Sequence, residues 1–260
     1  FNFAALALLE AALGSDFGLA ALPGFRETGT YPDLVTGPSG RTFNYADGGD
    51  GRGTCPATWW FAQRFNRPEL LPYFEADAYR RYCTERKTRK GVSVPAHGGN
   101  RMFAYGLFYV RTPPVDLRPD LPLVWNAGGP VPITVQRSSW DNRTAFFVGL
   151  KGGSPSANHG HMDGGSFILE ARGVRWALDL GAENYNKIEQ LGMNLWDMKQ
   201  GSDRWRVFRL GTSSHNVLML DGCPQRVTGF AQVREVKETP PSAVTLDLTS
   251  LYTNATEVLR

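Results

Sequence analysis

The hydrophobic pattern changes its period along this 260-residue chain, at about residues 111–122. Before that point apolar residues recur at helical spacing, as in 1–14 and 57–65, and Pro68 is suited to start a further helix through about Cys83. From Leu123 onward, short apolar runs alternate with turn residues, which is typical of antiparallel strands. The sequence therefore predicts a multidomain α+β protein with helices first and an antiparallel β-sandwich second.

The clearest strand signal is a hairpin in the second half. An apolar run from Ser166 to Ala171 leads through an Arg-Gly turn into a second run that starts at Val174 and ends in Asp179. Four further runs are expected to be strands, at 146–150, 207–210, 217–220 and 243–246.

A long segment rich in Gly, Pro, Asp and Thr, residues 29–56, separates the first helices. Loops of this length are uncommon inside compact domains and are often functional. Its glycines leave little side-chain packing, and Asp47 and Asp50 add charge. We expect residues 46–54 either to be highly mobile or to be ordered by contact with the sandwich.

Composition excludes some classes of protein. The net charge is only +3, and no stripe of Lys and Arg with interleaved aromatics predicts a nucleic-acid surface. The apolar opening stretch is short and carries Glu10, so it fits a buried helix better than a signal peptide or a membrane span. The chain starts without Met inside a helical pattern and stops in a strand-like run, so we expect it to be a fragment of a longer protein.

Three of the four histidines stand where chemistry could use them: His159, His161 and His215. On an extended strand, His159 and His161 would lie about 6.5 Å apart, which is too wide for one zinc ion without a bend. A better zinc set takes His161, Asp179 from the end of the hairpin, and His215. His159 would then be free to face a cleft.

Other interpretations of these residues stay open. The His-x-His-x-Asp pattern also occurs in metallo-β-lactamase-type hydrolases, but those need another His where Gly164 stands. All three histidines could instead be ordinary hydrogen-bonded residues, and Asp163 and Asp179 simple turn carboxylates. Tyr185 fits either a general acid/base or a packing aromatic.

Several stretches together resemble the heparinase II/III-like family of polysaccharide lyases, over about residues 125–225. The matching pieces are 137–140, 146–153, 158–167, 173–181 and His215-Asn216, with 37–47 resembling the end of that family's helical part. The resemblance implies the C-terminal end of an (α/α) toroid in residues 1–115. Residues 116–260 would be an antiparallel β-sandwich, truncated at its C-terminus.

The resemblance also implies roles for individual residues. His161, Asp179 and His215 match a single zinc site that is structural, and His159 matches a cleft-facing catalytic histidine. Tyr185 is a second catalytic candidate. We assign Asn158 and Arg137 to substrate binding, although Arg137 also fits a surface position at a strand end.

The implied reaction is β-elimination on an acidic polysaccharide that contains uronic acid, such as a glycosaminoglycan or alginate. A base removes the C5 proton and an acid protonates the departing oxygen. Two alternatives are a non-catalytic carbohydrate-binding or scaffolding member of the family and, less favoured, a zinc hydrolase. The family implies a periplasmic or secreted protein. Composition argues against a nucleic-acid partner and against membrane insertion, and a homodimer stays open.

Overall fold

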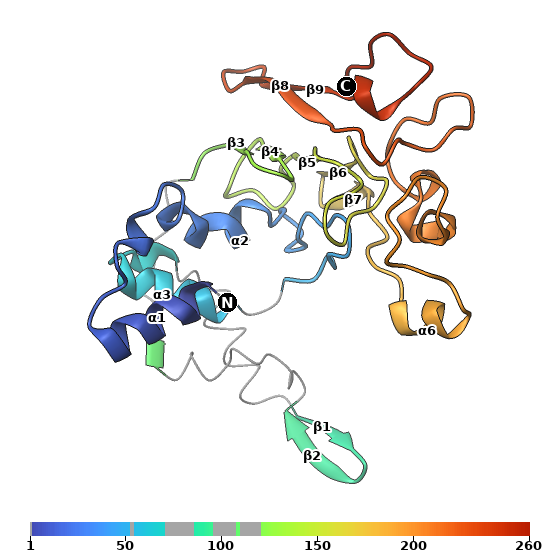
Figure 1. Cartoon of the computed structure of the whole chain (residues 1–260). Helices are drawn as coiled ribbons and strands as arrows, with labels where there is room; N and C mark the ends of the chain where they lie inside the picture. The colour runs from blue at the N-terminus through green and yellow to red at the C-terminus, as the bar shows by residue number, and fades with distance from the viewer. Residues whose placement is uncertain (1, 53–54, 71–85, 96–107, 110–120) are drawn as a thin grey trace. The chain divides into compact units, whose positions relative to one another are not determined.

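The computed structural model describes residues 2–52, 55–70, 86–95, 108–109 and 121–260 (Figure 1). The chain divides into two compact units: Phe1–Asp33 with Gly53–Leu121, and Leu34–Arg52 with Pro122–Arg260. The predicted domain boundary between residues 115 and 116 lies outside the described residues, as does most of the helix predicted over 68–83.

In the described part of the first unit, two helices pack together through aromatic and aliphatic side chains. Helix α1 spans Asn2–Leu13 and helix α3 spans Pro56–Arg64, and the two lie side by side (Figure 1). Trp60 of α3 packs against Phe3 of α1, with ring centroids 6.1 Å apart. Both helices confirm the sequence prediction. The short elements of this part are η1 (Leu19–Ala21), η2 (Arg26–Thr30), α2 (Tyr31–Leu34), η3 (Pro68–Leu70) and the hairpin β1 (Arg86–Arg89) and β2 (Val92–Pro95).

The second unit contains a five-stranded antiparallel sheet whose strands follow one another in chain order. This confirms the predicted antiparallel character of the second half. The strands are β3 (Val124–Ala127), β4 (Ile133–Arg137), β5 (Phe147–Lys151), β6 (Phe167–Ala171) and β7 (Val174–Ala177). A separate antiparallel pair follows, β8 (Gln232–Lys237) and β9 (Ala243–Asp247). The remaining elements are α6 (Tyr185–Gln190), η4 (Asp203–Arg206), η5 (Phe208–Leu210), η6 (Thr212–Ser214) and η7 (Thr249–Leu251).

The predicted hairpin is β6 with β7. Arg172 and Gly173 both have positive φ, 55° and 77°, as a two-residue type I′ turn requires. The register shifts near Leu169 and Glu170, and β7 ends at Ala177. Asp179 therefore lies just beyond the strand, not at its end as predicted.

Two predicted strands are wrong. Residues Phe208–Leu210 form a short 3₁₀ helix, because Val207 and Leu210 are the buried residues and lie three apart, which is the repeat of that helix. The run 217–220 pairs with no strand and makes only an isolated bridge from Leu220 to Cys223.

The Gly-rich segment is ordered over 34–52 by contact with the five-stranded sheet. Ser39 donates from its backbone and its hydroxyl to Glu170 on β6, at 3.0 and 2.9 Å. Phe43 packs on β5 at Gly149, where an added Cβ would lie 2.5 Å from the ring. Of the two alternatives for residues 46–54, the described residues 46–52 show contact with the strand-rich unit, for example from the N–H of Ala46 to Asp163. Within the described part of the chain, no helix has the length and apolar character to cross a membrane.

Candidate active site and metal centre

The histidine-rich segment connects β5 to β6 and is held by buried polar contacts. At the end of β5, Nζ of Lys151 lies 2.6 Å from Oδ1 of Asp163, and both side chains are buried. Gln225 brackets Gly164: it accepts from the backbone N–H at 3.1 Å and donates to the carbonyl at 2.7 Å. These contacts fix the segment, because buried polar groups are costly to leave unpaired.

The two neighbouring histidines face different surroundings. His159 adopts a left-handed backbone with φ of 56°, and Gly160 passes so close to Pro155 that an added Cβ would lie 2.3 Å from its carbonyl oxygen. This bend leaves the His159 side chain 48% exposed while His161 is fully buried. Left-handed non-glycine residues are uncommon and cluster at functional sites.

Three buried side chains form a metal-type cluster: His161, Asp163 and His215 each offer a ligand atom, and these atoms lie within 4.8 Å of one another. Among the described residues, no hydrogen-bond partner reaches Nδ1 of His161 or Nε2 of His215. The opposite nitrogens face carboxylates, so they carry the protons and leave the lone pairs on the unpartnered atoms. Such a donor set fits a divalent metal such as zinc.

Asp179 lies beside this cluster and contacts His215. It accepts from Nδ1 of His215 at 2.8 Å and from the backbone N–H of Gly181 at 2.8 Å. In this position it orients His215, while Asp163 supplies the carboxylate of the cluster. The structure thus brings the predicted ligands His161 and His215 together; direct ligation by Asp179 stays a prediction.

The electrostatics of the cluster suit ligands that must be neutral imidazoles and an ionised carboxylate. Burial lowers the pKa of His161, which keeps the ring uncharged. Burial acts most strongly and raises the pKa of Asp163, but the charge and hydrogen bond of Lys151 together with the charges of His215 and His161 outweigh it, and the pKa of Asp163 lies below its ordinary value.

Asp47 joins the exposed and the buried histidines. Its Oδ2 lies 2.7 Å from Nδ1 of His159, and its Oδ1 lies 3.0 Å from Nε2 of His161 and accepts from the Tyr185 hydroxyl at 3.1 Å. Burial acts to raise the pKa of Asp47, but hydrogen bonds, first from His161, outweigh it and hold that pKa below the ordinary value. A carboxylate from the Gly-rich segment is therefore part of the site.

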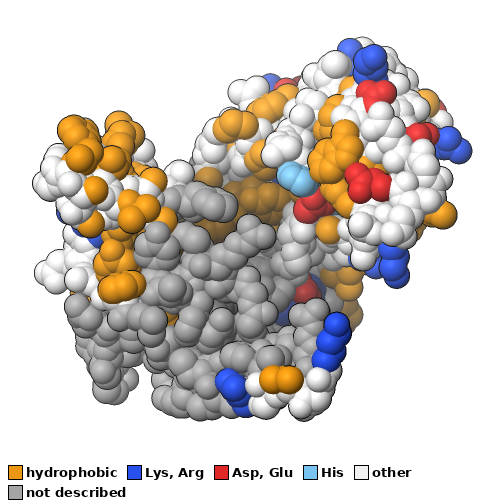
Figure 2. All heavy atoms as spheres, turned by 60° about the horizontal axis from the view of Figure 1, so that its bottom comes forward, with side chains coloured by type: hydrophobic (Ala, Val, Ile, Leu, Met, Phe, Trp, Pro, Cys, Tyr) orange, Lys and Arg blue, Asp and Glu red, His pale blue; other side chains and the backbone are white. Residues whose placement is uncertain are grey.

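The exposed side of the site is aromatic. The ring of His159 stacks on Tyr185, with centroids 6.1 Å apart and planes at 21°, and Trp196 stands edge-on to both. The buried Arg204 donates to the Tyr185 hydroxyl at 3.1 Å and to the carbonyl of Gly160 at 2.7 Å. Figure 2 shows a histidine at the surface with hydrophobic and acidic side chains around it.

Burial raises the pKa of Tyr185 above its ordinary value. The Tyr185 phenol therefore keeps its proton at neutral pH.

The two residues predicted to bind substrate are placed differently. Asn158 is exposed, next to His159. Arg137 is buried: it donates to the carbonyls of Leu34 and Thr36, and its guanidinium lies 3.3 Å from the ring centre of Trp140. This placement ties the Gly-rich segment to β4 and gives the substrate-binding prediction for Arg137 no support.

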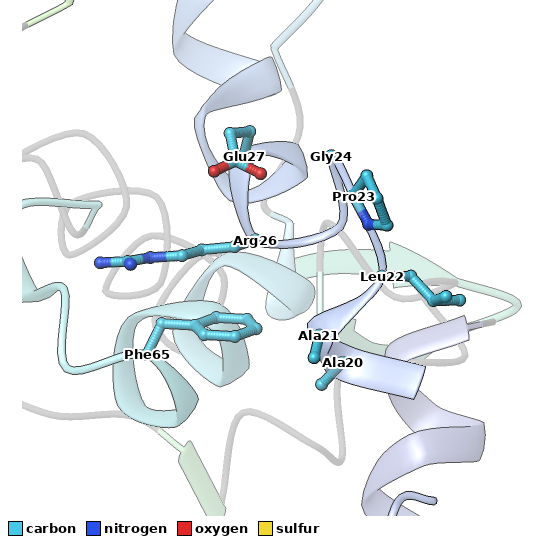
Figure 3. Close-up of a pocket in the computed structure, with 8 residues that line it drawn as sticks. All are labelled: Ala20, Ala21, Leu22, Pro23, Gly24, Arg26, Glu27 and Phe65. Atoms are coloured by element: carbon cyan, nitrogen blue, oxygen red, sulfur yellow. The ribbon is translucent and has the colours of Figure 1, made fainter. Parts of the chain in front are cut away.

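An open hollow of about 590 Å³ lies in the first unit and is separate from this chemistry. Figure 3 shows its lining, which is residues 20–24, Arg26, Glu27 and Phe65. It has mostly small and apolar walls, and the histidine cluster belongs to the other unit.

Sequence reasoning missed four residues of the site: Asp47, Lys151, Trp196 and Arg204. Asp47 lies 112 residues before its partner His159, so no local spacing connects them. The sequence feature that could have indicated Asp47 is the long Gly-rich segment itself. Loops of this length are often functional, so its charged residues are candidates for a site.

Residues 138–253 match the family described as heparinase II/III-like, C-terminal. This segment, somewhat less than half of the chain, is similar to the C-terminal domain of that family. This confirms the family predicted from the sequence. No sequence among the curated proteins matches the chain.

Solved structures of two polysaccharide-cleaving proteins are similar in fold to this chain. The heparan sulfate lyase HepC of Pedobacter heparinus is 19% identical with a TM-score of 0.57, over 95% of this chain and 33% of that one. A structure of heparinase III is 15% identical with a TM-score of 0.56, over 95% of this chain and 34% of that one. The chain thus spans about a third of the length of these structures.

Proposed function

We propose that this chain is part of a polysaccharide lyase that cleaves a uronic-acid-containing acidic polysaccharide, a glycosaminoglycan or alginate, by β-elimination. The observation that carries the proposal is an exposed imidazole, His159, held at Nδ1 by a carboxylate and stacked on a tyrosine that keeps its proton. A base and an acid side by side are what this elimination needs.

In the reaction, the C5 proton beside the sugar carboxylate leaves with the base. The electron pair of that C–H bond forms a C4–C5 double bond, the C4–O4 bond breaks, and O4 takes a proton as the new chain end. We assign the base to His159 and the acid to Tyr185, whose hydroxyl proton points to Asp47 until O4 of the substrate takes the place of that acceptor. Arg204 supports the developing phenolate, because its guanidinium already donates to the Tyr185 oxygen.

Trp196 extends the site towards the sugar. Its side chain is an exposed aromatic, 60% accessible, and its indole N–H donates to Glu189 at 2.8 Å, which fixes the ring. A rigid exposed indole beside the catalytic pair offers a flat face for the C–H face of a pyranose. We propose that it positions a sugar next to the one that is cleaved.

We propose that zinc occupies the buried cluster, held by His161 and His215 with Asp163 or Asp179 as the carboxylate. There it would join segments distant in sequence and so stabilise the domain. The burial of all three cluster members favours a structural ion over a hydrolase, which needs an open coordination position for water.

The architecture completes the proposal. We infer that residues 1–115 are the end of an (α/α) toroid and that 116–260 belong to an antiparallel β-sandwich. In such a protein, polar groups of the toroid would neutralise the sugar carboxylate, because proton removal beside an anion builds up charge.

The test is a measurement on the full-length protein that contains this chain, with a panel of uronic-acid polysaccharides. A lyase produces ultraviolet absorbance from the conjugated double bond together with new chain ends. New chain ends without absorbance would indicate hydrolysis and contradict the proposal. Binding without either product would indicate the non-catalytic alternative.

A further inference from the structure

Both carboxylate oxygens of Asp47 contact residues of the candidate site. Oδ2 faces Nδ1 of His159, and Oδ1 faces both Nε2 of His161 and the hydroxyl of Tyr185. An ionised carboxylate can only accept hydrogen bonds, so all three partners must point a proton at it. One side chain therefore dictates where three protons of the site reside.

For His159 this fixes the tautomer. With the proton on Nδ1, the neutral ring carries its lone pair on Nε2, the nitrogen that Asp47 does not contact. We propose that Asp47 is a positioning residue that holds His159 with Nε2 free to receive the substrate proton. The identity of that proton rests on the proposed lyase function, whereas the tautomer follows from the contact alone. When Nε2 takes the proton, the carboxylate stabilises the resulting imidazolium.

The same carboxylate acts on the buried cluster. It holds the proton of His161 on Nε2, which leaves the lone pair on Nδ1, the buried nitrogen without a partner. A carboxylate that orients a metal-binding imidazole in this way contributes about 10–100-fold in metal affinity. Asp47 thus links the exposed base to the buried cluster.

The backbone around Asp47 is fixed well enough for this role. The N–H of Ala46 donates to Oδ2 of Asp163 at 3.0 Å. Asn44 donates to the carbonyls of Gly48 and Asp179, at 3.3 and 3.1 Å. The segment on both sides of Asp47 is therefore anchored to the cluster that it orients.

The test is Asp47→Asn in the full-length protein, with Asp50→Asn as a matched control. Asp50 lies in the same segment, and its carboxylate pairs with the exposed Arg41 at 3.5 Å. Asparagine has almost the same shape, but its amide group replaces one acceptor by a donor, so three donors can no longer all be satisfied.

The first readout is the ¹⁵N spectrum of the histidine rings, in which the His159 signal is identified by its loss in His159→Ala. We expect the wild type to show His159 protonated at Nδ1, and Asp47→Asn to shift this pattern while Asp50→Asn does not. A wild-type His159 that is protonated at Nε2 overturns the proposal, whether or not the variant folds. This readout needs no activity, so it stands even if the lyase proposal fails.

The second readout is kinetic. We expect Asp47→Asn to lower kcat about 10²–10⁴-fold with KM nearly unchanged, since it disables a base and leaves binding surfaces intact. Zinc affinity should fall about 10–100-fold in the same variant. A kcat no lower than that of Asp50→Asn would refute the positioning role. The positioning role would also be refuted if Asp47→Asn kept the wild-type His159 tautomer and lost activity only in proportion to its loss of folded protein.

Discussion

At the residue scale, the site contains two histidines that are separated by one glycine and have different surroundings. Strand alternation would place His159 and His161 on one face, but the positive φ of His159 turns one ring outward and the other inward. The sequence indicated that these residues matter and that both could reach one zinc ion only through a bend. It could not show Asp47, because the contact joins two segments only in the folded chain.

Gly160→Ala should damage this bend. Its Cβ would lie 2.3 Å from the carbonyl oxygen of Pro155, a contact with rigid backbone that forces a shift. We expect a loss of about 1–3 kcal/mol in the free energy of unfolding, measured by denaturant titration. The control is Gly49→Ala, where nothing lies within 4 Å and the change should stay within about 0.5 kcal/mol. Equal stability of the two variants would contradict a close contact between Gly160 and the carbonyl oxygen of Pro155.

The metal cluster gives a second prediction at this scale. His161→Ala and His215→Ala should each lose bound zinc and thermal stability together, because metal binding and folding are coupled. Asp179→Asn should keep zinc with about 10–100-fold weaker affinity if Asp179 only orients His215. Zinc content by elemental analysis and melting temperature are the measurements. Stoichiometric zinc in both histidine variants would rule out the cluster.

At the element scale, the sequence predicted the β6–β7 hairpin correctly, because its signal lies in neighbouring residues. It predicted a strand wrongly at 207–210, because the structure there depends on residues elsewhere in the chain. The β6–β7 hairpin follows from two apolar runs and a turn whose two residues adopt positive φ. The run 207–210 looked similar, yet its buried residues are Val207 and Leu210, so its repeat is three and not two. Which side of an apolar run is buried depends on neighbours distant in sequence, here Leu195.

The connection between β5 and β6 should depend on one buried ion pair. Lys151→Met leaves Asp163 as a buried charge without its partner, which costs about 3–5 kcal/mol. Arg234→Met is the control: it removes an exposed pair with Glu257 and should cost no more than about 1 kcal/mol. Denaturant unfolding compares the two variants. A Lys151→Met protein as stable as the control would mean that the pair does not hold the connection.

At the scale of the whole molecule, sequence and structure agree that helical elements come first and antiparallel strands second, and residues 138–253 match the heparinase II/III-like, C-terminal family. The Gly-rich segment 34–52 belongs to the strand-rich unit although helical segments flank it in sequence. The sequence could not predict that this segment packs with the strands, because composition indicates a loop but not the surface on which the loop lies. It matters for function, since the segment delivers Asp47 to the histidines.

The measurement that tests the central proposal most directly is the rate of ultraviolet-absorbing product formation by the full-length wild type and by His159→Ala. We expect the wild type to generate unsaturated product from at least one uronic-acid polysaccharide. His159→Ala should lose about 10²–10⁴-fold in this rate while it keeps its zinc and its melting temperature. A His159→Ala protein that forms the product at nearly the wild-type rate, or a wild type that forms none, would contradict a lyase that works through His159.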